Sequence, residues 1–217
     1  LFPQWSPDGA MILVTSSHEG DFDVFKVSAD GGPMIDATPD VSGCMIGTWS
    51  ADGECIYYSK DFSLFKLELA SNKSTLVANG SWIGHESTDG NTLYHSNIVI
   101  GSSEGWLLYE KPTDNLDPYD LGKLVHADIR MQMPQTFYTR ENKLFWLGWD
   151  ENDTQKIDKP LMTMDPNSEN PLQISVIRNL PDLYHNIDLS LDGKQALIPR
   201  QPKAESDIMI FKHPPLR

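Results

Sequence analysis

Residues 101–105, GSSEG, have the Gly-x-Ser-x-Gly spacing that surrounds the nucleophilic serine of many hydrolases. That chemistry requires a strand before the serine and a helix after it, because the sharp turn between them exposes the hydroxyl group. The residues that follow here, WLLYEK, indicate another strand, and the chain contains no α/β-hydrolase pattern that could supply the other catalytic groups. We therefore interpret the segment as a loop of small residues, and we predict no catalytic residue in this chain.

Neither the histidines nor the acidic segment at 150–154 has the spacing of a metal site. No two histidines stand as in H-x-x-x-H or H-E-x-x-H, because Asp89 occupies the place of the second histidine after His85. The segment DENDT lacks the central glycine and the placed glutamate of a calcium loop. We predict no metal and no cofactor, while a zinc site assembled from distant parts of the chain stays open. The six histidines are His18, His85, His95, His126, His185 and His213.

The composition is that of an acidic, globular chain. Its 217 residues are 39% hydrophobic and carry a formal net charge of −14. Such a charge repels nucleic-acid phosphates, so we expect no nucleic-acid binding by this segment. A well-solvated surface is one interpretation of the charge, and patches that bind cations or basic partners are the other. No apolar run approaches about 18 residues, so we expect no membrane insertion by this segment.

The two cysteines, Cys44 and Cys55, flank one predicted turn. A hairpin that turns at residues 52–53 would place residues near 48 opposite residues near 56, which leaves the cysteines several residues out of register. Because a disulfide requires two close Cα atoms, we expect none here, and the cysteines do not determine the compartment.

One five-residue phrase occurs twice, as WSPDG at 5–9 and as WSADG at 49–53. Each copy is followed by two short apolar runs, which predicts strands joined by tight turns. In a weaker fourth copy Asn142 replaces the turn glycine, and asparagine tolerates a left-handed conformation. The weaker copies lie at 86–90, 138–142 and 189–193. The predicted strands are 10–16, 22–27, 54–59, 63–69, 105–111, 160–165 and 207–212.

Several short strands per repeat and no helical pattern predict an all-β fold. A single four-stranded antiparallel sheet cannot bury both of its faces, whereas sheets arranged around an axis cover one another. Repeats of about 40–50 residues are typical of propeller blades. We therefore predict one β-propeller domain over residues 1–217, with five four-stranded blades visible, and six or more if residues precede Leu1 in a longer protein. A β-sandwich would not produce five copies of one turn phrase.

Aligning the copies on the turn glycine separates two sets of positions. Large side chains mostly stand four residues before the glycine, where they would pack between blades. Polar side chains mostly stand one residue earlier and would point the other way on the strand. The first set is Trp5, Trp49, Glu86, Tyr138 and Leu189. The second set gives Gln4, Thr48, His85 and Asp188 as candidate ligand-binding residues that line the channel, with hydrogen bonding within and between blades as their alternative role.

The phrases QWSPDGAMILVTSSHEGDFDVFKVSADGG and TWSADGECIYYSKDFSLFKLEL resemble the repeats of TolB-type propellers. The ending, LSLDGKQALIPRQPKAESDIMIFKHPPLR, resembles the last blade in the TolB-like C-terminal domains of CadC-type transcriptional regulators. The resemblance covers essentially the whole chain. It implies a DNA-binding winged helix, a single membrane span and an extracytoplasmic C-terminal domain in the complete protein. This chain contains only the last of these parts, so the regulator assignment concerns sequence outside it.

The sequence thus predicts a non-catalytic sensory or interaction propeller of a CadC-like, membrane-anchored transcriptional regulator, located in the periplasm. We expect it to bind a protein partner or a small molecule at a propeller face. One alternative is a free-standing periplasmic TolB-like scaffold for protein–protein contacts. The other is an accessory propeller of a hydrolase or lyase, whose active site would lie outside this chain.

Overall fold

The computed structural model is built from β-strands. Within the residues that it describes there are nineteen strands and no helix, so none of these residues forms a helix able to cross a membrane. The predicted all-β class is confirmed. The described residues are 1–17, 20–98, 106–125, 137–147, 159–168, 170–177, 188–189, 195–200 and 207–212.

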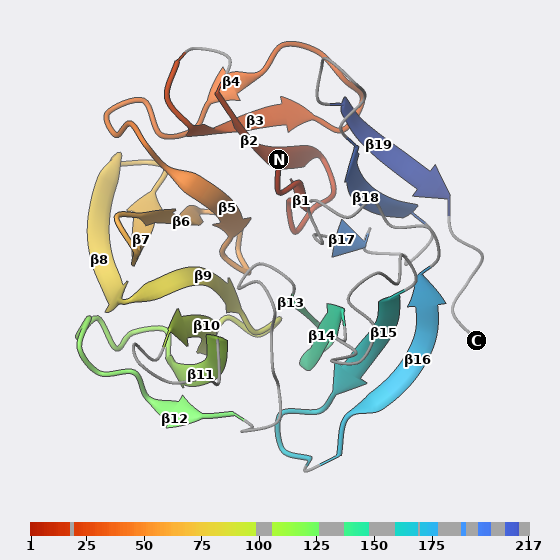
Figure 1. The fold of residues 1–217 in the computed structure, drawn as a ribbon. Helices are drawn as coiled ribbons and strands as arrows, with labels where there is room; N and C mark the ends of the chain where they lie inside the picture. The colour runs from red at the N-terminus through yellow and green to blue at the C-terminus, as the bar shows by residue number, and fades with distance from the viewer. Residues whose placement is uncertain are drawn as a thin grey trace.

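The strands form antiparallel sheets arranged around a common centre (Figure 1). Four sheets have four strands, and a fifth has three strands among the described residues. In every sheet the strands lie side by side in the order of the chain, so each sheet is one blade formed by consecutive hairpins. This architecture is the predicted β-propeller, and the strands expected from the apolar runs are present within one residue at each end.

The strands of each blade follow one another along the chain. Blade 1 contains β1 (Gln4–Trp5), β2 (Met11–Ser16), β3 (Asp23–Ser28) and β4 (Ile35–Asp36). Blade 2 contains β5 (Met45–Trp49), β6 (Cys55–Lys60), β7 (Ser63–Glu68) and β8 (Lys73–Asn79). Blade 3 contains β9 (Ser81–Glu86), β10 (Thr92–Ile98), β11 (Trp106–Pro112) and β12 (Lys123–Leu124). Blade 4 contains β13 (Phe137–Arg140), β14 (Lys143–Leu147), β15 (Lys159–Met164) and β16 (Leu172–Ile177). Blade 5 contains β17 (Asp188–Leu189), β18 (Gln195–Arg200) and β19 (Asp207–Lys212).

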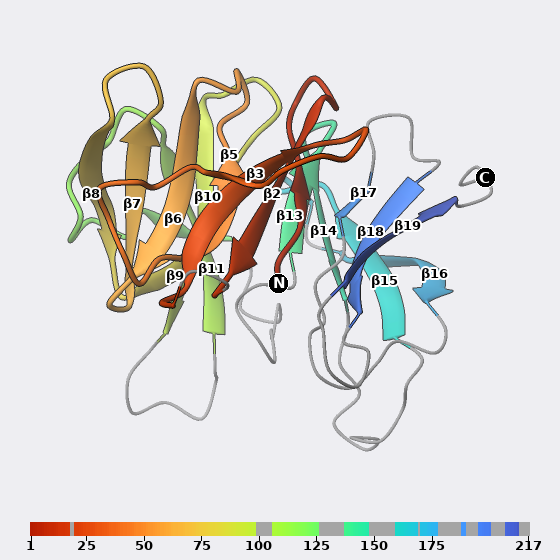
Figure 2. The ribbon, with the colours of Figure 1, turned by 90° about the horizontal axis from the view of Figure 1, so that it is seen from above.

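The repeated phrase forms a turn that its own serine and aspartate close. In the first copy Ser6 Oγ donates to Asp8 Oδ1 at 2.5 Å and accepts a hydrogen bond from Met11 N at 2.9 Å. The turn glycine, Gly9, has a left-handed φ of 72°. The serine–aspartate bond recurs in Ser50–Asp52 and Ser87–Asp89, at 2.6 Å in both. The phrase therefore encodes one S-x-D-G turn, and Figure 2 shows these turns on the same side of the ring.

The fourth copy forms a shorter turn than the alignment predicted. Arg140 pairs directly with Lys143, which leaves the two-residue turn Glu141-Asn142 between β13 and β14. Their φ angles are 48° and 57°, so both residues are left-handed, as in a type I′ hairpin. The predicted left-handed conformation of Asn142 is confirmed, but this copy lacks the serine and aspartate that widen the other turns. The copy at 189–193 lies largely outside the described residues.

Two glycines allow the innermost strands to approach the preceding blade closely. A Cβ atom at Gly47 would lie 2.4 Å from Val24 Cγ1 of blade 1. At Gly84 it would lie 2.5 Å from Leu64 Cδ2 of blade 2. Both distances are too short for a Cβ atom, so only glycine at these positions allows the blades to pack this closely.

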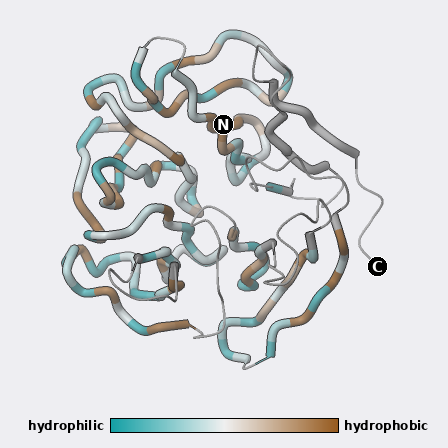
Figure 3. The backbone as a smooth tube through the Cα atoms, in the orientation of Figure 1, coloured by the Kyte–Doolittle hydropathy of each residue, from teal (hydrophilic) through white to brown (hydrophobic). Residues whose placement is uncertain are grey.

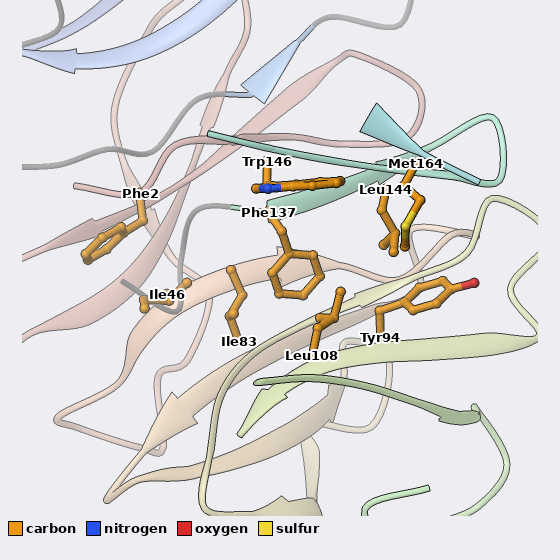
Figure 4. Close-up of a cluster of buried hydrophobic side chains, with 9 residues drawn as sticks. All are labelled: Phe2, Ile46, Ile83, Tyr94, Leu108, Phe137, Leu144, Trp146 and Met164. Carbon is orange, nitrogen blue, oxygen red and sulfur yellow. The ribbon is translucent and has the colours of Figure 1, made fainter. Parts of the chain in front are cut away.

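Apolar side chains from four blades meet on the inner strands (Figure 4). Phe2 belongs to blade 1, Ile46 to blade 2, Ile83 to blade 3 and Phe137 to blade 4, and each is at most 3% exposed. This cluster therefore joins the innermost strands of blades 1 to 4 in one hydrophobic core. Figure 3 shows that other hydrophobic residues are spread over the strands of the first four blades rather than gathered in one layer.

A buried lysine fastens the loop between β11 and β12 to blade 2. Lys111 is 2% exposed, and its Nζ donates to the carbonyl oxygens of Val77, Asp117 and Asp120 at 2.6, 2.9 and 3.3 Å. Burial lowers the pKa of Lys111. Three carbonyl dipoles stabilise the ammonium group, and they hold the loop at 113–122 over the joint between blades 2 and 3.

The two cysteines are free thiols, as expected. Met45 lies opposite Ser59 in the β5–β6 pair, so Cys44 stands beyond one end of this pair while Cys55 begins β6 at the other end. Burial raises the pKa of Cys44 to about 12, so this thiol is unreactive at neutral pH.

Candidate functional site

A pocket of about 300 Å³ lies where the innermost strands run into the turns. All five innermost strands contribute to its wall, so the pocket is at one mouth of the central channel. Three S-x-D-G turns and the shorter turn of blade 4 form its rim. The lining residues are Gln4, Trp5, Ser6, Pro7, Trp49, Ser50, Ala51, His85, Glu86, Ser87, Thr88, Tyr138, Thr139, Arg140, Glu141 and Asp188.

Three of the four candidate residues contact the following blade, and three of the four line the pocket. Gln4, His85 and Asp188 line the pocket, whereas Thr48 is not among the lining residues. All four are at most 7% exposed. The contacts are Thr48 Oγ1 to Gly84 O at 2.5 Å, His85 to Phe137 at 5.0 Å between ring centroids, and Asp188 Oδ2 to Trp5 N at 2.6 Å. Hydrogen bonding between blades, the alternative role, therefore describes Thr48 and Asp188.

Glu86 brings a carboxylate to the pocket wall at the position where the first two copies have tryptophan. Its Oε1 accepts hydrogen bonds from Tyr57 OH at 2.5 Å and from Lys66 Nζ at 3.2 Å. Its Oε2 accepts one from Ala51 N at 2.9 Å. All three donors belong to blade 2 or its turn, so this side chain contacts the preceding blade. Burial and the nearby Glu86 carboxylate raise the pKa of Tyr57, which keeps the phenol protonated and donating.

Five buried polar atoms of the pocket residues have no hydrogen-bond partner within the described part of the chain. Buried polar groups in folded proteins are nearly always paired, and each unpaired one costs about 1–3 kcal/mol. Two further unpaired atoms, on Asp23 and Ser96, belong to residues outside the pocket. This concentration sets the pocket apart from the rest of the described structure. The five atoms are Gln4 Nε2, Trp5 Nε1, Trp49 Nε1, His85 Nε2 and Tyr138 OH.

The two titratable groups among these five residues are uncharged at neutral pH. Burial lowers the pKa of His85 to about 3. The ring packs against Phe137, and its Nε2 has no hydrogen-bond partner among the described residues. A neutral imidazole carries its proton on one of its two nitrogens, so Nε2 donates in one tautomer and accepts in the other. Burial, with the nearby Asp188 carboxylate, raises the pKa of Tyr138, which keeps its hydroxyl protonated.

A serine–histidine hydrogen bond, which the sequence did not predict, is found away from the pocket. Ser81 Oγ and His95 Nδ1 are 2.7 Å apart, and His95 Nε2 donates to Leu121 O at 3.0 Å. Ser81 therefore donates to the histidine, which is the polarity of a serine paired with a histidine base, but among the described residues no acidic side chain orients the ring, whose second nitrogen is held by a backbone carbonyl. Both side chains are 0% exposed, and burial lowers the pKa of His95 to about 4. We interpret this pair as a structural contact.

No group of three histidine, cysteine or acidic side chains that could hold a metal ion is found among the described residues. The segments GSSEG at 101–105 and DENDT at 150–154 lie outside these residues. The same is true of the histidines at 18, 126, 185 and 213.

Comparisons with known proteins identify the fold through solved structures. No protein-family model and no curated protein sequence matches the chain. TolB from Acinetobacter baumannii is 14% identical with a TM-score of 0.66, over 98% of this chain and 51% of that one. A putative TolB from Agrobacterium tumefaciens is 16% identical with a TM-score of 0.63, over 97% and 73%. An oligogalacturonate lyase in complex with manganese is 11% identical with a TM-score of 0.51, over 96% and 72%.

The fold is that of a TolB-like β-propeller. This chain spans about half the length of the Acinetobacter TolB. The solved structures that resemble this chain include both TolB proteins and a lyase. The fold alone therefore does not define an activity.

Proposed function

We propose that this chain is a non-catalytic binding domain that takes a small molecule, or a side chain of a protein partner, in the pocket at the mouth of its channel. The observation that carries the proposal is the set of five unpartnered polar atoms on residues of one pocket. A group that enters the pocket and pairs with them removes an energetic cost that the empty domain bears. Convergent polar groups in a concave site are the usual mark of a ligand site.

The absence of catalysis is part of this proposal. The pocket places no serine or cysteine beside a histidine, since its serines close their own turns. Its best-placed carboxylate, on Glu86, accepts hydrogen bonds from Tyr57, Lys66 and Ala51. A carboxylate engaged in this way is held as a structural anion rather than presented as a base.

We place the domain in a CadC-like, membrane-anchored transcriptional regulator, outside the cytoplasm, as its sensory or interaction part. The support for this setting is the likeness of the last repeat and of the repeat order to those regulators. A ligand would act there by binding two orientations or association states of the propeller with different affinity. A free-standing TolB-like scaffold is the second candidate, supported by the two TolB neighbours.

A thermal-shift screen of the purified domain at two pH values tests the proposal. The panel contains metabolites, sugars, amines and divalent metals, because a ligand that binds only the folded state raises the melting temperature, increasingly with the logarithm of its concentration above Kd. We expect a concentration-dependent shift that Gln4→Ala removes and that Gln173→Ala, at an exposed position of β16, retains. A shift that survives Gln4→Ala contradicts the pocket assignment. No shift with any compound contradicts small-molecule binding and favours the scaffold.

A further inference from the structure

The unpartnered atoms are hydrogen-bond donors or acceptors, and this character indicates which groups a ligand must offer. Gln4 Nε2, Trp5 Nε1 and Trp49 Nε1 can only donate hydrogen bonds. His85 Nε2 donates or accepts according to its tautomer, and Tyr138 OH can do both. The complementary ligand therefore offers several acceptor oxygens, and a ligand whose groups also donate fits either tautomer of His85.

Two classes of charged ligand, cations with an ammonium group and anions such as carboxylates, do not suit these groups. An ammonium compound has donors but no acceptors, so it would leave the amide and both indole N–H groups unpaired. A carboxylate or phosphate has acceptors, but it would enter a pocket lined by three acidic residues and one arginine, in a chain with a net charge of −14.

Uncharged hydroxyl groups satisfy both requirements, since each hydroxyl oxygen donates once and accepts twice. The wall also contains three aromatic side chains, Trp5, Trp49 and Tyr138, which suit the apolar C–H faces of a ring that carries hydroxyls. The volume of about 300 Å³ is at the lower end of small-molecule sites, so it suits one ring or two rather than a long chain.

We propose that the pocket binds an uncharged monosaccharide, either free or as the terminal unit of a glycan, through Gln4, Trp49, His85 and Tyr138. This inference rests on the proposed function, because it assigns a ligand class to the same pocket. The five polar atoms have almost no exposed surface themselves, so sugar hydroxyls reach them by rotation of side chains at the wall. That rearrangement offsets part of the binding energy, and we expect a Kd of about 1 mM.

Saturation-transfer NMR and thermal shifts with matched probes test the ligand class. The probes are neutral hexoses and pentoses, their methyl glycosides, the corresponding uronic acids and the corresponding amino sugars. We expect the neutral sugars to bind and the charged analogues to bind at least tenfold more weakly. Binding of the free sugars alone assigns the site to free sugars, and binding of the methyl glycosides as well assigns it to a glycan end.

Two variants connect the binding to the unpartnered atoms. Tyr138→Phe removes the hydroxyl but keeps the ring that stacks on Phe145, so this variant folds at least as stably as the parent. We expect it to weaken sugar binding about threefold to tenfold, and Trp49→Phe to do the same. The matched controls Tyr94→Phe and Trp82→Phe change residues that do not line the pocket, and they should leave the Kd unchanged.

The outcomes separate this inference from the proposed function. Tighter binding of uronic acids or amino sugars overturns the ligand class while the pocket remains a binding site. Neutral-sugar binding that Tyr138→Phe and Trp49→Phe leave unchanged overturns the assignment to these groups. No saturation transfer from any sugar overturns the inference, and the broader panel then decides whether the pocket binds another ligand.

Discussion

The carboxylate of Asp188 accepts a 2.6 Å hydrogen bond from the backbone N–H of Trp5, which lies 183 residues away in the chain. This contact joins the innermost strand of blade 5 to that of blade 1. Because Asp188 is only 7% exposed, removal of its carboxylate leaves a buried N–H group without a partner. We expect Asp188→Ala to lower the free energy of unfolding by about 2–3 kcal/mol and Asp188→Asn by about 1 kcal/mol, measured by urea denaturation.

The exposed Asp114 provides the matched control for this prediction. Asp114→Ala should change the free energy of unfolding by less than about 0.5 kcal/mol. If Asp188→Ala has an effect as small as this control, the bond to Trp5 does not stabilise the joint between blades 5 and 1.

Gly47→Ala should destabilise the joint between blades 1 and 2. The new methyl group would lie 2.4 Å from Val24 Cγ1, and valine cannot rotate freely away because it is branched at Cβ. We expect a loss of about 1–3 kcal/mol in urea denaturation. Val24→Ala makes room, so the double variant should lose less than the sum of the two single variants. Strict additivity would mean that the two side chains do not compete for the same space.

Lys111→Met should loosen the loop at 113–122. The thioether cannot donate, so the carbonyl groups of Val77, Asp117 and Asp120 lose their shared donor. We expect a loss of about 2–3 kcal/mol and faster proteolytic cleavage within 113–122. Lys123→Met, at a side chain that is 74% exposed, is the control and should behave as the parent. Equal cleavage of both variants would show that the three carbonyl bonds do not hold the loop.

Acid should destabilise the domain through His85 and His95. Burial lowers their folded-state pKa values to about 3 and about 4, below the unfolded value of about 6.5. Between about pH 6.5 and pH 4 the unfolded chain binds protons that the folded chain does not. Stability is therefore complete above about pH 6.5 and falls as the pH decreases, by about 1.4 kcal/mol per pH unit for each histidine.

Urea denaturation at several pH values above 4.5 checks this dependence. We expect His85→Gln to have a shallower slope than the parent, because one of the two depressed groups is gone. An unchanged slope would show that His85 is already protonated in the folded domain, or that it titrates alike in both states.

Much of the fold follows from local sequence. Ser6, Asp8 and Gly9 act within a single turn, so their recurrence at 50–53 and 87–90 identifies the same turn wherever it occurs. The apolar runs between turns predict the strands in the same local way. The two-residue turn at Glu141-Asn142 was placed correctly, but its tighter geometry depends on pairing between β13 and β14, which the residue types alone do not specify.

The site follows from sequence only in part. Alternation along a strand separates Gln4 and His85 from Trp5 and Glu86, yet all four residues line the pocket, so alternation alone does not define its wall. The repeat alignment predicts packing between blades for Trp49 and Tyr138, and both residues also line the pocket. The partners of Glu86 are 20 to 35 residues away in a different blade, and no equivalence between repeats reveals such a pair.

Different positions of the S-x-D-G turn have different roles: three residues fix the backbone of the turn, and the second residue has a side chain that varies. Serine, aspartate and glycine close each turn, while the variable second position is Pro7, Ala51 or Thr88, and all three line the pocket. None of these side chains makes a hydrogen bond within its own turn, but Thr88 Oγ1 accepts one from Asn142 N in the turn of blade 4. The rim can therefore change its chemistry at Pro7 and Ala51 without change to the scaffold, much as an antibody varies its loops on a constant framework. Selectivity in this architecture can diversify by single substitutions that leave the free energy of unfolding nearly unaltered.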